Sequence, residues 1–516
     1  MPLVTRGGNA ALIPLGKLHS LRPLPAHVGL LPQRVLDTMS RHNRRREKTT
    51  GPMTRLPRPP RGTAPALTVL RPHAAGIDVH SDMHMVCVPA ASAPPETGDG
   101  GLPANVRRFG ANSCDLHAIA EWLQACGVTS VAIESTGVYW VPLFELSEAR
   151  GFEVWLVEPG QLSRCGARPK TDALDAQWIQ RLHSYGLLQP SFRPADSVLA
   201  LRGYHRQRQM LIRYAAGHTL HMQKALERMN VKLAEVVSDI TGATGQRIIS
   251  GILKGERDPR VLALLRDPKC KNDAAKIAKA LEGTWRPEHL FALKQAHELY
   301  RFLRQQIASC DALIRAELDR LPDRAGGRTA TTKPRRCGRK PNDLSFDACG
   351  PLLRALGVGL TEVEGIDVGT ALVILAEIGV DVSRFPTEKH FASWLGVCPR
   401  QHRSNGTTKK RGPRKGKNRV AIALRMAAQA VGRTQSPLGL FYRRIKGRIG
   451  GQGAVTATAH KLARLVYRML KYGAEYVKRS PADYEAKLRA QVERQLRARA
   501  ARLGFELVPR CAATGP

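Results

Sequence analysis

The sequence predicts three regions of different fold class: an α/β domain, a long helical middle and a mostly helical C-terminal domain. Apolar runs of strand type alternate with amphipathic helical patterns between about residues 69 and 195, which is typical of an α/β layer architecture. Apolar residues then recur at helical spacing over residues 196–232 and 287–320. With 516 residues and 43% hydrophobic content, the chain can bury two or three ordinary cores.

Local patterns predict the individual elements of the α/β region. Strands are expected at Val69–Val79, Met83–Pro89, Val128–Glu134 and Phe152–Val157, and helices at Asp115–Cys126, Val141–Arg150 and Ala173–Gly186. The first two strands are expected to pair with each other. Three tryptophans of these apolar stretches are expected to serve the core, namely Trp122, Trp140 and Trp155.

The helical middle leaves two arrangements open. The patterns at 196–232 and 287–320 fit an antiparallel arm within the chain or a dimerising coiled coil. A run rich in Gly, Arg, Thr and Pro at 326–341 follows and is expected to be a flexible basic linker.

The last domain is expected to open near Leu352. A short apolar helix at Leu360–Val363, a glycine-containing turn and a helix at Thr370–Ile378 resemble a helix-hairpin-helix. In such a turn, Gly365 and Gly369 would present backbone N–H groups to a phosphate.

These patterns divide the chain into six expected regions. Residues 1–68 are rich in Pro, Arg and Gly and cannot bury enough apolar surface to become ordered, so a disordered basic arm is expected there. The other regions are an α/β domain at 69–195, a helical or coiled-coil region at 196–325, a basic linker at 326–350, a mostly helical domain at 351–480 and a helical tail at 481–516.

The charge of the chain restricts its partners. A net charge of +38 and a pI near 10.5 favour nucleic acid or an anionic membrane. No apolar run is long enough to span a bilayer, so nucleic acid is the expected partner. The 10 cysteines form no Cys-x-x-Cys pair, which argues against a zinc ribbon and a secreted disulfide framework and fits a reduced cytoplasm. No signal peptide is expected.

Four acidic residues stand out in this basic chain: Asp78, Glu134, Asp172 and Asp175. The first two occupy strand positions where apolar residues would be expected, and the spacing of Asp172 and Asp175 puts both on one helix face near its first turn. Like charges so close repel unless a cation neutralises them, and four converging carboxylates suit two Mg²⁺ ions. Two such ions can activate the attacking oxygen and stabilise the leaving oxygen of a phosphodiester.

Ordinary structural roles compete with this hypothesis. An aspartate at the end of a strand, such as Asp78, is more often a turn or cap residue. Asp172 can simply cap the helix Ala173–Gly186 or complement its dipole. The order of strand Asp, strand Glu and helical Asp-x-x-Asp within one domain is much less expected by accident.

A second candidate element lies in the basic segment after Trp394. Ser404 precedes Asn405-Gly406 and a series of seven cations, namely Lys409, Lys410, Arg411, Arg414, Lys415, Lys417 and Arg419. The cations are expected to contact phosphates from a solvated loop. Ser404 can equally be a nucleophile, because neighbouring cations lower the cost of an alkoxide and stabilise a pentacovalent phosphate.

The whole pattern resembles the DEDD-type insertion-sequence transposases, the bridge-RNA-guided recombinases that join a RuvC-like nuclease domain to a serine-bearing transposase domain. The resemblance covers about residues 70–475, and its most specific part is a Lys-Thr-Asp-x-x-Asp-Ala block after a Glu-x-Thr-Gly-x-Tyr block. The matching segments are Gly76–Asp78, Glu134–Gly137, Lys170–Ala176, the Gly365 hairpin, Gly396–Arg400 and Ser404–Gly406.

This resemblance implies an RNase H/RuvC-like fold for the α/β domain and a serine transposase domain with a helix-hairpin-helix at 351–480. It implies that the four carboxylates bind Mg²⁺ and that Ser404 attacks DNA to form a covalent phosphoserine, so that strands can be exchanged without ATP. The implied partners are donor and target DNA, a guide RNA pairing with both, and further copies of the chain. In the implied dimer or tetramer, the carboxylates of one protomer serve the serine of another, in the bacterial cytoplasm.

The chain departs from the family pattern at the serine. The family usually has Ser-Gly where this chain has Ser404-Asn405-Gly406, which leaves Thr407 or Thr408 as less favoured nucleophiles. Two other functions stay open: a metal-dependent, structure-specific nuclease that uses water and needs no serine, and a non-catalytic packaging protein suggested by charge alone. Four aligned carboxylates would weaken the phosphate affinity of a packaging protein.

Overall fold

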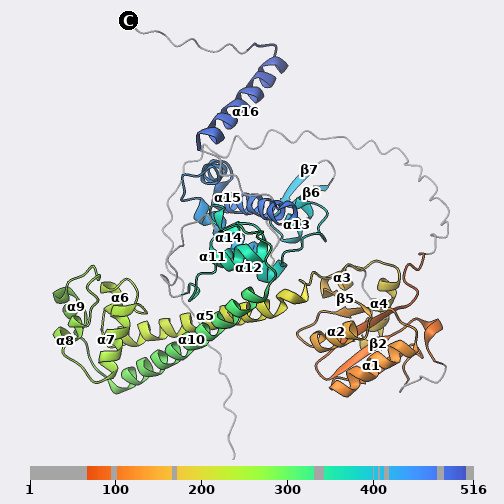
Figure 1. The fold of residues 1–516 in the computed structure, drawn as a ribbon, viewed down its shortest axis with the longest axis horizontal. Coiled ribbons are helices and arrows are strands. Elements are labelled where there is room, and N and C mark those ends of the chain that lie inside the picture. The colour runs from red at the N-terminus through yellow and green to blue at the C-terminus, as the bar shows by residue number, and fades with distance from the viewer. Residues whose placement is uncertain are drawn as a thin grey trace, which may run out of the picture.

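The computed structural model describes residues 67–94, 101–165, 171–329, 342–398, 400–404, 407–411, 418–473 and 481–506. Nearly all of the expected N-terminal arm, residues 330–341 of the expected linker and the end of the tail lie outside these residues. Figure 1 shows an α/β domain, a long two-helix arm with a small helical tip, and a helical domain beside the end of the arm that lies away from the tip.

A five-stranded mixed sheet with the order β3-β2-β1-β4-β5 forms the centre of the α/β domain. Its strands are β1 (Ala74–Val79), β2 (Met83–Cys87), β3 (Val106–Gly110), β4 (Ser130–Glu134) and β5 (Glu153–Val157). β1 pairs antiparallel with β2 and parallel with β4, and β4 pairs parallel with β5. The expected pairing of the first two strands is confirmed, whereas β3 was not predicted.

Helices cover both faces of this sheet. They are α1 (Ser113–Ala125), α2 (Trp140–Ala149), α3 (Pro159–Leu162) and α4 (Asp172–Ser184). α1 and α2 share one apolar core with β1, and α4 shares another with β4 and β5 on the opposite face. The mixed α/β class is therefore as predicted, and the more specific RuvC-like fold stays a prediction.

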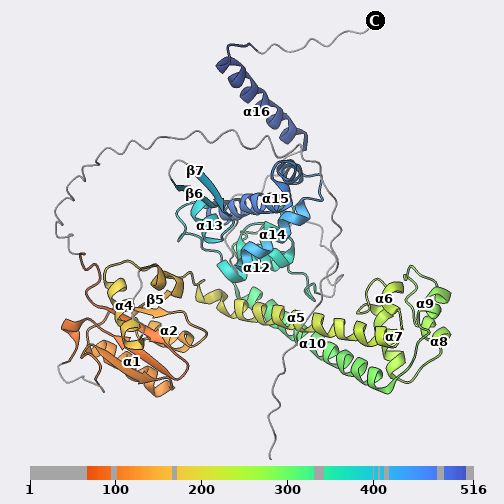
Figure 2. The ribbon, with the colours of Figure 1, turned by 180° about the vertical axis from the view of Figure 1, so that it is seen from behind.

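The arm consists of α5 (Leu199–Arg228) and α10 (Pro287–Arg320), which run antiparallel along each other in both views (Figures 1 and 2). Its tip holds α6 (Leu233–Val236), α7 (Ala243–Leu253), α8 (Pro259–Leu264) and α9 (Ala274–Ala280) around an apolar core of its own. Inside the arm, the buried guanidinium of Arg208 pairs with the buried carboxylate of Asp311. An antiparallel arm within the chain, the first of the two expected arrangements, is thus present.

The C-terminal domain is mostly helical, as predicted. It contains α11 (Cys349–Leu356), a 3-10 turn (Leu360–Glu362), α12 (Val368–Ile378), α13 (Glu388–Trp394), the hairpin strands β6 (Arg400–Ser404) and β7 (Thr407–Arg411), α14 (Arg419–Val431) and α15 (Pro437–Tyr472). α15 is kinked at Gly450, and α16 (Pro481–Arg502) follows. None of the helices described is long and apolar enough to cross a membrane.

The expected helix at Leu360–Val363 is only a 3-10 turn, so the helix-hairpin-helix is not confirmed. Gly365 has a φ of 87°, and a Cβ there would clash with Val431 and lie 2.7 Å from the carbonyl oxygen of Ala427 on α14. The glycine is therefore needed to pack this turn against α14. Its predicted contact with a phosphate stays a prediction.

The segment after the α/β domain is attached to the C-terminal domain. Arg384 donates hydrogen bonds to the carbonyl oxygens of Pro190 at 2.7 Å and Ser191 at 3.3 Å. The ring of Phe192 packs against Phe385 and Trp394, with centroids 5.6 and 5.0 Å away. These contacts attach the segment that follows the α/β domain to the C-terminal domain.

Candidate metal centre and serine hairpin

The sheet brings two of the predicted carboxylates together. β1 and β4 are parallel, and their last paired residues are Ile77 and Ile133. Asp78 and Glu134 each follow directly, so they lie side by side at the carboxyl ends of the two strands. Asp78 is buried and Glu134 is half-buried. Asp78 is therefore neither a turn nor a cap residue, and a buried acid between apolar strand residues requires a chemical explanation.

A close approach of α4 to β1 supplies the other two carboxylates. A Cβ at Gly76 on β1 would clash with the backbone nitrogen of Gln180 and lie 2.7 Å from the carbonyl oxygen of Ala176. Only glycine permits this contact, which sets the first turn of α4 beside the end of β1. That first turn carries Asp172 and Asp175.

Thr171, not Asp172, caps α4. Its hydroxyl accepts a hydrogen bond of 3.3 Å from the backbone N–H of Leu174. The alternative role of Asp172 as the N-cap is therefore wrong, because the residue before it already fills that position. Acidic residues in the first turn still benefit from the helix dipole, which helps α4 to tolerate two of them.

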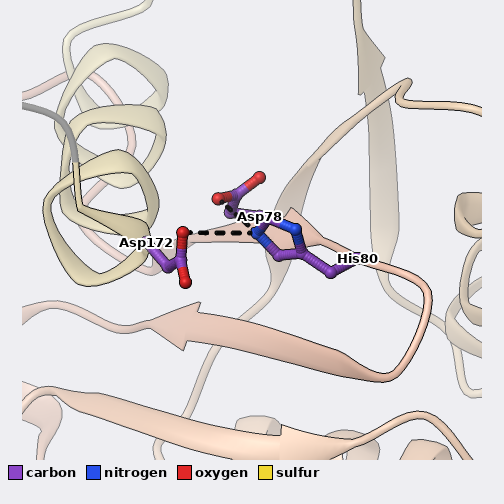
Figure 3. Close-up of side chains that lie close together, drawn as sticks. All are labelled: Asp78, His80 and Asp172. Atoms are coloured by element: carbon purple, nitrogen blue, oxygen red, sulfur yellow. Dashed lines mark hydrogen bonds and ion pairs between the residues drawn. The ribbon is translucent and has the colours of Figure 1, made fainter. Parts of the chain in front are cut away.

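A histidine that the sequence analysis did not single out joins this group. The Nε2 atom of His80 lies 3.2 Å from Oδ2 of Asp78 and 3.5 Å from Oδ1 of Asp172 (Figure 3). One ligand atom from each of these three residues lies within 4.8 Å of the other two. The three side chains can therefore surround one metal ion.

The charges of Glu134 and Asp175 act on Asp78 at this end of the sheet. The pKa of Asp78 is raised to about 6, because burial and the nearby carboxylates of Glu134 and Asp175 raise it more than His80 lowers it. Glu134 also accepts a 3.1 Å hydrogen bond from the hydroxyl of Thr136. A buried carboxyl whose neighbours disfavour its ionised form gains most from a bound cation. The oxygen-rich donor set fits Mg²⁺ or Mn²⁺.

Ser404 lies on a different domain from the carboxylates. It is the last residue of β6 and pairs with Thr407, the first residue of β7. Both views show this hairpin on the C-terminal domain, away from β1 and α4 (Figures 1 and 2). The backbone of one chain therefore does not bring the serine to the carboxylates.

The predicted phosphate-binding cations lie in the second strand of the hairpin and in the segment that follows it. Lys409, Lys410 and Arg411 belong to β7, and Arg419 begins α14 with its guanidinium 3.5 Å from a carboxylate oxygen of Glu377. The other three cations, Arg414, Lys415 and Lys417, lie outside the described residues. Gly369, one of the two glycines predicted to contact a phosphate, lies in the first turn of α12.

Two protein-family models match this chain, one over the segment with the carboxylates and one over the segment with Ser404. The model of the DEDD transposases of IS110 elements, described as "Transposase", matches residues 75–231 and so contains the four carboxylates. A second model, described as "Transposase IS116/IS110/IS902 family", matches residues 359–443 and contains Ser404.

A curated relative agrees with these matches. The "Insertion element IS110 uncharacterized 43.6 kDa protein" of Streptomyces coelicolor is 32% identical over 130 residues. The aligned segment covers 24% of this chain and 31% of that protein, so the chain spans about a third of the relative's length in this match. The likeness is thus confined to part of each protein.

Proposed function

The chain belongs to the IS110 family of DEDD transposases, and we propose that it cleaves and exchanges DNA strands by phosphodiester transesterification. The observation that supports this activity best is that ligand atoms of Asp78, His80 and Asp172 lie within 4.8 Å of one another while the charges of Glu134 and Asp175 act on Asp78. Asp78, with its raised pKa, is the buried centre of that group.

The proposed role of the carboxylates is to hold two Mg²⁺ ions, with Asp78, Glu134, Asp172 and Asp175 as the ligands. When bound, such ions activate an attacking oxygen and stabilise a leaving oxygen. The protein contributes the geometry: two ligands come from adjacent parallel strands, and two from a helix turn that Gly76 allows to approach. Burial of Asp78 strengthens its attraction to a bound cation.

The proposed nucleophile is the hydroxyl of Ser404. Its Oγ would bond to phosphorus while a strand oxygen leaves and gains the proton that the serine loses. The number of phosphoester bonds is conserved, so a hydroxyl of the second strand can reverse the step and reseal the backbone without ATP. The cations of β7 would neutralise the phosphates on either side.

The proposed active site is shared between protomers. One chain keeps Ser404 and the carboxylates on different domains, so a dimer or tetramer can bring the serine of one copy to the carboxylates of another. Donor DNA, target DNA and a noncoding guide RNA pairing with both are the proposed partners, in the bacterial cytoplasm. The net charge of +38 supports nucleic-acid partners.

A RuvC-type nuclease is the second candidate. The separation of Ser404 from the carboxylates within one chain favours it, because hydrolysis by a metal-activated water needs only the α/β domain. The two functions differ in whether the protein becomes covalently bound to DNA.

Covalent trapping separates them. The full-length protein is incubated with a labelled suicide DNA substrate, a candidate guide RNA from the flanking DNA and Mg²⁺, then denatured and examined for labelled protein. Label is expected on the wild type and on Thr407→Ala and Thr408→Ala, and none on Ser404→Ala. Label on Ser404→Ala that disappears from one threonine variant would move the nucleophile to that threonine. Strand cleavage without label on any version would establish the nuclease.

A further inference from the structure

The candidate metal centre contains His80, a side chain that has no role in the proposed set of four carboxylate ligands. We propose that His80 is a nitrogen ligand of the bound metal and that it makes the centre prefer Mn²⁺ to Mg²⁺. This inference rests on the proposed role of the carboxylates as metal ligands. It concerns the identity of the metal, because the oxygen atoms of the carboxylates fit Mg²⁺ as well as Mn²⁺.

The position of the imidazole matches that of a ligand. Around one ion with bonds of about 2.1 Å, adjacent ligand atoms lie roughly 3.0 to 3.4 Å apart. The Nε2 atom of His80 lies 3.2 Å from Asp78 and 3.5 Å from Asp172 (Figure 3). The first separation falls within this range and the second lies just above it, so both atoms are close to the spacing of neighbouring ligands of one ion.

The backbone holds His80 in this place. β1 ends at Val79, and the backbone N–H of His80 donates a 3.0 Å hydrogen bond to the carbonyl oxygen of Met83 at the start of β2. This tight connection fixes the residue beside the end of β1. Its side chain is 38% exposed, so apolar packing does not account for its orientation towards two carboxylates.

A simpler explanation is that His80 is only a counter-ion. A protonated imidazole would then neutralise Asp78 and Asp172, and it would leave its position when a bound metal ion neutralises them instead. The two explanations differ in one observable respect. A ligand keeps its nitrogen bonded to the metal, whereas a counter-ion is displaced by it.

A nitrogen ligand alters the choice of metal. Mg²⁺ favours oxygen ligands in a near-ideal octahedron and gives up its water reluctantly. Imidazole suits transition metals, while carboxylates also accept Mn²⁺. A set of carboxylates with one imidazole therefore combines the donors that Mn²⁺ accepts and Mg²⁺ uses less well.

Binding of Mn²⁺ to the full-length protein tests this without any activity assay. The electron paramagnetic resonance signal of free Mn²⁺ gives its affinity, competition gives that of Mg²⁺, and pulsed spectra detect a nitrogen bonded to Mn²⁺. His80→Ala should lose the nitrogen coupling and at least about 10-fold in Mn²⁺ affinity, a loss typical even of residues that only support a ligand. Its Mg²⁺ affinity should change much less. His80→Asp should bind Mg²⁺ and show no nitrogen coupling.

Two further variants make the result decisive. His117→Ala removes a histidine of α1 that contacts Arg150, and it should bind Mn²⁺ like the wild type. Asp175→Asn should weaken both metals. If Asp175→Asn weakens metal binding while His80→Ala keeps the wild-type Mn²⁺ affinity and the nitrogen coupling is absent, His80 is a counter-ion and the inference fails alone. If neither variant changes metal binding, the proposed metal centre itself is wrong.

Discussion

Two buried carboxylates of this protein have opposite surroundings. Asp78 lies among other acids, and burial together with Glu134 and Asp175 raises its pKa to about 6. Glu377 of α12 lies among arginines. Burial works to raise its pKa, yet the hydrogen bonds and charge of Arg206, with the charges of two further arginines, hold it below the ordinary value.

The geometry around Glu377 shows a charge that the fold itself satisfies. Arg206 donates to Oε1 at 2.9 Å and to Oε2 at 2.6 Å, and Arg202 donates to Oε2 at 3.2 Å. Both arginines belong to α5, so the cluster fastens the arm to the C-terminal domain. Around Asp78, the imidazole of His80 lies beside the carboxylates of Asp78 and Asp172. The comparison indicates that Glu377 serves the structure, and it agrees with the proposal that the acidic group around Asp78 binds a metal cation.

The largest expected effect of changing a carboxylate of the acidic group is on DNA strand cleavage. Asp175→Asn should lower DNA strand cleavage roughly 1000-fold or more, because a lost ligand charge weakens the stabilisation of the transition state by several kcal/mol. The melting temperature should stay the same or rise, since the substitution relieves repulsion between carboxylates. Glu121→Gln on the exposed side of α1 is the control and should cleave normally. Wild-type cleavage by Asp175→Asn would remove this residue from the proposed site.

The opposite result is expected for the structural carboxylate. Glu377→Gln leaves three guanidinium groups without their buried partner and should destabilise the C-terminal domain by about 3 kcal/mol. Thermal unfolding and hydrogen exchange of α12 measure the effect. Glu298→Gln removes an exposed partner of Lys294 at 4.0 Å and should cost less than about 1 kcal/mol. Equal stability of the two variants would show that the arginine cluster does not fasten the arm.

Gly76 links the fold to the metal centre. Gly76→Ala should push α4 away from β1 and destabilise the α/β domain by about 1 to 3 kcal/mol, the usual cost of overpacking. Cleavage should fall with it, because Asp172 and Asp175 move with α4. The control is Gly203→Ala, since a Cβ at that position of α5 meets no atom within 4 Å. Normal metal affinity in Gly76→Ala would mean that the close approach does not position the ligands.

The sequence pointed to the four carboxylates because each stands out in a local pattern, and their role as metal ligands stays a prediction. Asp78 and Glu134 stand in apolar strands, and Asp172 and Asp175 repeat at helical spacing. The α/β class followed from the same alternation. Domain boundaries, metal ions, guide RNA and oligomer stay predictions.

Other features depend on contacts that no local pattern reveals. Gly76 matters only because α4 crosses it, and the role of His80 depends on an aspartate that is distant in the chain. β3 was missed because its exposed arginines, Arg107 and Arg108, weaken the apolar pattern of an edge strand. The hairpin did have a signal: Asn405-Gly406 is the pair of residues favoured between two antiparallel strands, and it was interpreted only as a departure from the family.

The smallest expected effect concerns the basic strand beside the serine. Each phosphate contact contributes about 0.9 to the logarithmic salt dependence of DNA affinity, so reversing Lys409, Lys410 and Arg411 to Glu should flatten the slope by about 3. Reversing Lys271, Lys276 and Lys279, three exposed cations at the tip of the arm, changes the net charge equally. Because the net charge is matched, a difference in slope between the two variants reports local phosphate contacts. Identical slopes would mean that β7 contributes to the general positive field and does not touch the backbone, in which case the cations would attract DNA without orienting it towards Ser404.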